Sequence, residues 1–280
     1  MKNTLLLPEL REYLATNKAA AIRSFCEEGH PAMVADLISS LKPDEVWRVL
    51  LHTSEERRAE IFAHLPTDIQ VEVSSRLNRG ELARLLTEMS PDDRVDLFKQ
   101  FPEEHQEMIL PALAQAERED LRRLASFPEG TAGSVMTSDY ATLLPDLTVA
   151  EAITRLRQEA PDKETIYYAY VIDENRKLLG LVSLKDLIIA RSQALVKDIM
   201  EQDIVYVNAD DDQEEAARKI EQYDLIALPV VNRDGMLIGI ITHDDAFDII
   251  VQEQTEDIEK LMAIGGAHEP RVYLSTSAWE

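Results

Sequence analysis

The chain has 280 residues, 45% of them hydrophobic, and a formal net charge of −24 at pH 7, a field that repels nucleic acid and anionic lipid and attracts cations. The length allows two or three domains with proper cores, and no run of eighteen apolar residues is present to span a bilayer. A single cysteine, Cys26, excludes an internal disulfide, and the lack of a secretory signal favours the cytoplasm.

The first 125 residues are predicted to form short helices joined by tight turns. Helix starts recur at intervals of about ten to thirteen residues, and Thr53 with Glu56, like Ser90 with Asp93, has the spacing of a capping box. The amphipathic runs between these starts are too short to be stable alone. Neighbouring helices must therefore stack on one another, as they do in an α-solenoid.

One pattern occurs twice in the following part of the chain, after a proline and two glycines interrupt the helical period at residues 126–135. The copies read GLVSLKD at Gly180–Asp186 and GIITHDD at Gly239–Asp245, and helix starts precede them at Thr148 and Asp212. Short β-branched strands separated by helices predict a small mixed α/β unit. The duplication predicts two such units that pack face to face.

A last long helix is expected from Asp244 to Ile264, with an apolar stripe on one side and acidic residues on the other. The stripe comprises Phe247, Ile250, Val251, Ile258, Leu261 and Met262. Residues 201–260 carry 17 Asp or Glu against 4 Lys or Arg. Composition alone leaves two readings open, a solvated acidic surface and a cation-binding one.

Five motifs, SPDDRVDLF, FPEGTAGSVMT, GLVSLKDL, GIITHDDAFDII and EQTEDIEKL, occur in this order. With them the chain resembles the cytosolic part of the MgtE family of magnesium channels and transporters. The resemblance implies an α + α/β multidomain fold, with an N-terminal all-α superhelical domain (1–128) and tandem CBS domains (129–198 and 199–250). An acidic connecting helix and a tail (244–280) then lead to a transmembrane pore domain outside this sequence.

Carboxylates are the candidate metal ligands, because Mg²⁺ is a hard cation that keeps several waters and needs only one or two of them per site. By resemblance, the positions that match acids holding regulatory magnesium in the family are Asp92, Asp96, Glu214, Asp224, Asp245, Asp248, Glu253, Glu256 and Asp257. The alternative for any one of them is a solvated or capping side chain, and Asp92 belongs at a helix N-terminus for dipole reasons alone. The resemblance further implies that Mg²⁺ bridges acidic side chains of the helical domain, the CBS pair and the connecting helix, and thereby favours a compact closed state.

ATP is a second expected ligand. In many CBS pairs the aspartate of this repeated motif receives a ribose and the hydroxyl residue helps with phosphate, which makes Ser183, Lys185 and Asp186 the candidate nucleotide site. The alternative is that Ser183 and Asp186 only cap the helix that follows. Dense carboxylates around the second copy disfavour phosphates there, so we expect one nucleotide site in each chain.

No catalytic motif is found, so we expect no enzymatic activity: the histidines lack zinc-enzyme spacing, and no phosphate-binding glycine motif occurs. The expected partners are a second copy in a homodimer, the chain's own pore domain and Mg²⁺, at the cytoplasmic face of the cell membrane. Nucleic acid is not expected. The competing hypothesis is an adaptor in which the helical domain binds a protein partner and the CBS pair senses adenine nucleotides.

Overall fold

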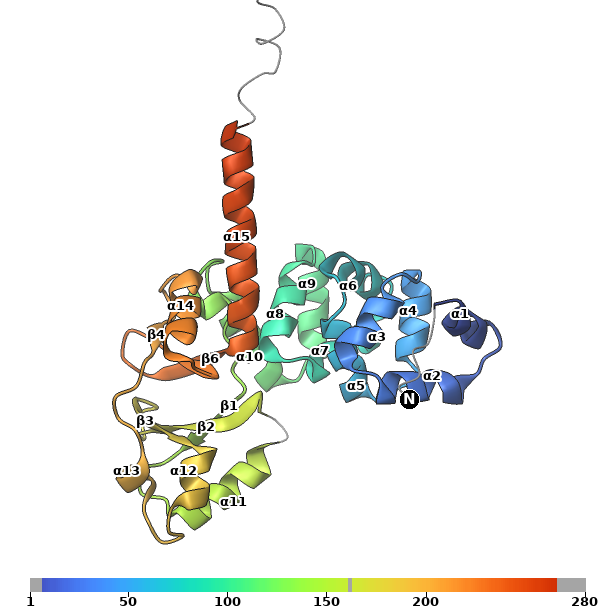
Figure 1. Ribbon diagram of the computed structural model, residues 1–280. Coiled ribbons are helices and arrows are strands. Elements are labelled where there is room, and N and C mark those ends of the chain that lie inside the picture. The colour runs from blue at the N-terminus through green and yellow to red at the C-terminus, as the bar shows by residue number, and fades with distance from the viewer. Residues whose placement is uncertain (1–6, 161–162, 266–280) are drawn as a thin grey trace, which may run out of the picture. The chain divides into compact units, whose positions relative to one another are not determined.

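The computed structural model describes residues 7–160 and 163–265, without the side chains of residues 256, 257, 259 and 261–265. It divides into two compact units. The first, helical, runs up to Phe127 and includes Thr137–Asp139, whereas the second, mixed α/β, comprises Pro128–Met136 and the chain from Tyr140 onward (Figure 1). The predicted fold class, an all-α unit followed by α/β units and a long helix, is confirmed.

The helical unit contains a succession of short helices. They are α1 (Leu7–Ala15), α2 (Ala19–Glu28), α3 (Pro31–Ile38), α4 (Pro43–Leu50), α5 (Glu55–Ala63), α6 (Thr67–Ser74), α7 (Arg79–Glu88), α8 (Pro91–Lys99), α9 (Glu103–Ile109), the 3-10 turn η1 (Leu110–Ala112) and α10 (Gln115–Ala125). From α3 to α10, each helix packs on the second one after it, which is the stacking that short amphipathic helices require. Phe62 and Leu86 are among the fully buried side chains of the core.

Long polar side chains close the tight turns between these helices. Arg58, Gln70, Arg94 and Gln106 each occupy the fourth position of a helix and donate hydrogen bonds to backbone carbonyls at the end of the preceding helix or in the turn that follows it. Those carbonyls lack partners within their own helix. Arg94 is consequently buried, although it lies in the charged sequence PDDRVDLF, and it fixes the start of α8.

Of the two predicted capping boxes, the one at Thr53 is wrong. Ser54, not Thr53, caps α5, because its side chain accepts a hydrogen bond from the Arg57 backbone N–H. The Thr53 hydroxyl instead donates to Glu27 at 2.6 Å.

At Ser90 the N-cap position is correct, but the side chain forms no capping hydrogen bond and its hydroxyl donates to the Asp93 carboxylate at 2.8 Å. The predicted helix starts at Thr148 and Asp212 are confirmed by their capping hydrogen bonds.

The mixed unit contains two three-stranded sheets with the same order and the same directions. Its elements are η2 (Ala132–Ser134), β1 (Tyr140–Leu143), α11 (Val149–Glu159), β2 (Thr165–Ile172), β3 (Leu178–Ser183), α12 (Leu184–Ile189), α13 (Val196–Ile199), β4 (Val207–Asn208), α14 (Gln213–Tyr223), β5 (Ala227–Val231), β6 (Leu237–Thr242) and α15 (His243–Gly265). In each sheet the first strand is parallel to the second and the third is antiparallel to it. The duplicated motif therefore ends β3 in one copy and β6 in the other.

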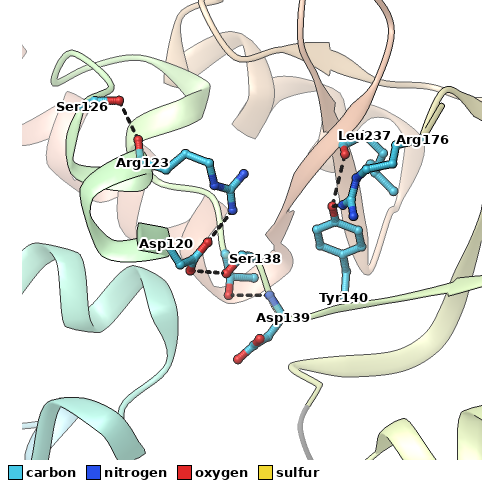
Figure 2. Close-up of polar contacts among 9 residues, drawn as sticks. Asp120, Arg123, Ser126, Ser138, Asp139, Tyr140, Arg176 and Leu237 are labelled. Carbon is cyan, nitrogen blue, oxygen red and sulfur yellow. Dashed lines mark hydrogen bonds and ion pairs between the residues drawn. The ribbon is translucent and has the colours of Figure 1, made fainter. Parts of the chain in front are cut away.

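The two copies pack on each other through a shared apolar cluster, as the duplication predicts. Tyr140 and Tyr170 of the first copy lie in this cluster with Leu237 of the second. The Tyr140 hydroxyl donates to the Leu237 carbonyl at 3.2 Å and accepts from the Arg176 guanidinium at 2.6 Å (Figure 2). The β2–β3 turn adds a backbone bond, from the Leu237 N–H to the Arg176 carbonyl.

The segment Thr137–Asp139 is built into the helical unit. The Ser138 hydroxyl donates to Asp120 of α10 at 2.7 Å, and Arg123 pairs with the other oxygen of that carboxylate at 2.5 Å (Figure 2). The residues just before this segment belong to the mixed unit, where the Ala132 N–H donates to the Asp211 carbonyl at 2.7 Å. Hydrogen bonds therefore anchor the chain to the mixed unit at Ala132 and to the helical unit at Ser138, only a few residues apart.

The final helix, α15, packs on α14 through a different face from the predicted apolar stripe. Ala246 and Ile249 are buried, whereas Phe247, Val251 and Ile258 are more than half exposed. Residues spaced by three and four positions face the neighbouring helix, and this spacing selects Ala246, Ile249 and Glu253. Within the described part of the chain, no helix is both long and apolar enough to cross a membrane.

Candidate functional site

Asp92 and Asp96 lie four residues apart on α8, so their side chains share one helix face. Asp96 is exposed, whereas Asp92 is half-buried, and its Oδ1 is buried without a hydrogen-bond partner. Burial, and secondarily the charge of Asp93, raise the pKa of Asp92 to about 6. Asp92 is therefore a carboxylate that the surrounding protein stabilises poorly in its ionised form.

Glu214 and Asp224 lie at opposite ends of α14. Glu214 is exposed in the first turn and faces Arg218, with the Nε and Oε1 atoms 4.0 Å apart. Asp224 terminates the helix in the left-handed conformation, with φ of 50°. Aspartate tolerates this conformation better than most residues but less well than glycine, so a structural role in ending α14 is present at Asp224.

Three candidate acids with described side chains lie on α15. Asp245 accepts hydrogen bonds from the backbone N–H and the hydroxyl of Thr242, and therefore caps the start of the helix. Asp248, three residues later, is exposed. Glu253 accepts a hydrogen bond of 2.9 Å from the Gln213 side chain at the start of α14.

Glu256 and Asp257 belong to α15, but their side chains lie outside the described residues, as does the whole predicted tail from residue 266. Among the side chains that are described, no group of three or more His, Cys, Asp or Glu residues is close enough together to hold a metal ion. The candidate acids therefore lie on three helices, α8, α14 and α15, and those with described side chains form no such group.

The candidate nucleotide residues lie where β3 meets α12. Ser183 is the N-cap of α12: its Oγ accepts from the Asp186 N–H at 3.1 Å, and its hydroxyl donates to the Asp186 carboxylate. Ser183 and Asp186 therefore do cap the helix that follows them, which was the alternative to a nucleotide site. Lys185 and Asp186 are exposed, and both can contact a ligand at this end of the sheet.

Sequence reasoning missed the residues that hold these elements together. Gln213 is 6% exposed and links α14 to Glu253 on α15. Arg176 has a positive φ of 62° and joins the two copies through Tyr140. A capping position followed by glutamine was the only signal for the first, and no sequence signal pointed to the second.

Two family models match the chain. The MgtE intracellular N domain covers residues 29–130, and the CBS domain covers residues 132–193 and 196–252. A magnesium transporter MgtE of Thermus thermophilus is 38% identical over 92% of this chain, and one of Bacillus subtilis is 31% identical over 90%. The chain spans 58% and 56% of the lengths of these relatives.

Two solved structures share the fold over most of the chain. The soluble part of a magnesium transporter matches with a TM-score of 0.83 and 29% identity, over 88% of this chain and 97% of that one. The cytosolic domain of the Mg²⁺ channel MgtE in complex with ATP matches with a TM-score of 0.81 and 38% identity, over 87% and 100%. These relatives are named as transporters, in agreement with the prediction that the chain is not an enzyme.

Proposed function

The chain belongs to the MgtE family, and on that premise we propose that it is the magnesium-sensing and gating region of a magnesium channel or transporter. Mg²⁺ bridges carboxylates of the helical domain, the CBS pair and the connecting helix, and thereby favours a compact, closed state. The partners in this proposal are a second copy of the chain and the protein's own pore domain. The region acts at the cytoplasmic face of the cell membrane.

The observation that carries the proposal is the placement of the candidate acids. They lie on α8, α14 and α15, and no described group of them forms a complete metal site by itself. A hydrated Mg²⁺ ion needs only one or two protein carboxylates. Sites of this kind are individually weak, which suits the sensing of an abundant cation.

The energy for gating comes from charge repulsion that the ion reverses. Two carboxylates about 4 Å apart repel by about 1 kcal/mol in water and by about 4 kcal/mol at an effective dielectric constant near 20. With a net charge of −24, several such pairs oppose compaction when no cation is bound. Moving a two-state equilibrium from 1:99 to 99:1 requires about 5.5 kcal/mol of differential binding, which several weak sites supply together.

The test is thermal melting of the full chain with increasing Mg²⁺, for the wild type and for a variant carrying Asp245→Asn, Asp248→Asn, Glu256→Gln and Asp257→Asn. A ligand at 100 times its dissociation constant stabilises the folded state by about 2.7 kcal/mol. We expect a rise in melting temperature for the wild type that is largely lost in the variant. An equal rise in both proteins would exclude these four acids as the sensing set.

ATP is the second ligand that we propose, because a structure 38% identical to this chain is a complex with ATP. Ser183, Lys185 and Asp186 provide a hydroxyl, a cation and a carboxylate at one end of β3, which suits ribose and phosphate groups. Melting in the presence of ATP or AMP, with and without Mg²⁺, separates the two ligands. Stabilisation by nucleotide alone, with none by Mg²⁺, would favour the adaptor hypothesis over magnesium gating.

A further inference from the structure

The two copies of the repeated motif carry opposite charges at an equivalent position. Strand register makes Ser183, opposite Tyr168, equivalent to Thr242, opposite Ala227. In both copies the hydroxyl donates to the aspartate three residues later. Two residues after the hydroxyl, however, the first copy has Lys185 and the second has Asp244, and both side chains are exposed.

A pocket of about 540 Å³ opens at this place in the second copy. It lies entirely within the mixed unit, where the start of β2 meets the end of β6, the start of α15 and the residues that precede β5. The residues that shape it include Glu164, Tyr167, Asp224, Ile226, Thr242 and Asp244. Its volume falls within the range of small-molecule sites, about 300–1,000 Å³.

The lining of this pocket combines negative charge with exposed apolar surface. Glu164, Asp224 and Asp244 contribute three carboxylates, and among the described residues that line the pocket the one basic side chain is the imidazole of His243. Tyr167 is 61% exposed and Ile226 is 43% exposed. A phosphate is repelled by such a rim, whereas a cation is attracted both by the carboxylates and by the face of a tyrosine ring.

We infer that this pocket binds an organic cation that carries an apolar body, and that it rejects phosphorylated ligands. The apolar body contacts Tyr167 and Ile226, and the cationic group faces Asp244. The two copies of the motif are thus divided by charge, with the proposed anionic ligand at Lys185 and the cationic one at Asp244.

The full chain is titrated with benzyltrimethylammonium, a phenyl ring joined to a quaternary ammonium, and binding is followed by saturation-transfer NMR. Phenyl phosphate and benzyl alcohol are the anionic and neutral probes of similar size. We expect the ammonium to bind more tightly than either. Asp244→Lys weakens this binding by about tenfold or more, and Tyr167→Ala weakens it about two- to fivefold through the lost ring contact.

The matched control is Lys185→Asp, the reverse charge change at the equivalent position of the first copy, which leaves ammonium binding unchanged. Asp244→Asn keeps the size of the side chain and weakens binding severalfold, so the charge is tested even if the lysine disturbs α15. The proposal is overturned if phenyl phosphate binds as tightly as the ammonium, or if Asp244→Lys and Lys185→Asp have equal effects.

Discussion

Replacing Asp92 by asparagine is expected to stabilise the helical unit at neutral pH. The carboxylate has a buried, unpartnered oxygen, and its pKa is raised from 3.8 to about 6, first by burial and then by Asp93. A difference of that size corresponds to about 3 kcal/mol by which folding disfavours the ionised group. Loss of the favourable interaction with the α8 dipole removes about 0.5–1 kcal/mol of this gain, which leaves about 2–2.5 kcal/mol.

The pH dependence follows from the direction of the shift. Between about pH 4 and pH 6 the folded state holds a proton on Asp92 that the unfolded state has released, so the wild type loses stability as pH rises through this window. Asparagine carries no such proton. The advantage of Asp92→Asn should therefore be full at pH 7.5 and small at pH 4.5.

Thermal melts followed by circular dichroism at both pH values provide the measurement, without added divalent cations. About 1 kcal/mol shifts the melting temperature by about 2–4 °C for a chain of this size. Asp96→Asn on the same helix face is the control, because an exposed substitution usually changes stability by less than about 0.5 kcal/mol. A stabilisation that is the same at pH 4.5 and pH 7.5, or none at all, would refute the raised pKa assigned to Asp92.

Three further outcomes follow from the contacts described. Asp224→Gly relieves the left-handed conformation that ends α14, so it should stabilise the fold by about 0.5–1 kcal/mol while it weakens the Mg²⁺ response. A matched Asp224→Asn should lose the Mg²⁺ response with little change in melting temperature. An undiminished Mg²⁺ response in both variants would remove Asp224 from the sensing set. Glu253→Ala leaves the buried Gln213 amide unpaired and should destabilise the fold by about 1–3 kcal/mol, as measured by urea denaturation. Glu253→Gln should destabilise it less, and an equal loss of stability in both variants would show that the hydrogen bond is unimportant. Lys185→Ala should weaken ATP binding in calorimetry several-fold without altering the Mg²⁺ response, and unchanged ATP affinity would place the nucleotide elsewhere.

The sequence predicted the architecture well because its signals are local and repeated. The GLVSLKD and GIITHDD copies specify the same strand–helix junction, and hydrogen bonds between the hydroxyl and the aspartate occur in both. Helix caps at Thr148 and Asp212 were also predictable, since each depends on two residues three or fewer positions apart. The stacking of the short helices followed from their length alone.

Tertiary contacts explain where sequence reasoning failed. The apolar stripe of Phe247, Val251 and Ile258 indicated a packed face, but α14 meets the narrower face of Ala246 and Ile249. A hydropathy pattern does not show which face of α15 meets the neighbouring helix. The raised pKa of Asp92 likewise depends on the packing around the start of α8, so the sequence showed only an acid at a helix N-terminus.

Small-angle X-ray scattering of the full chain, with and without millimolar Mg²⁺, tests magnesium-dependent compaction most directly. The proposed bridging of opposed carboxylates predicts a smaller radius of gyration in Mg²⁺, with most of the decrease lost when Asp245, Asp248, Glu256 and Asp257 are neutralised together. A monovalent salt at matched ionic strength separates ion bridging from general screening. An identical radius at every Mg²⁺ concentration would contradict the account.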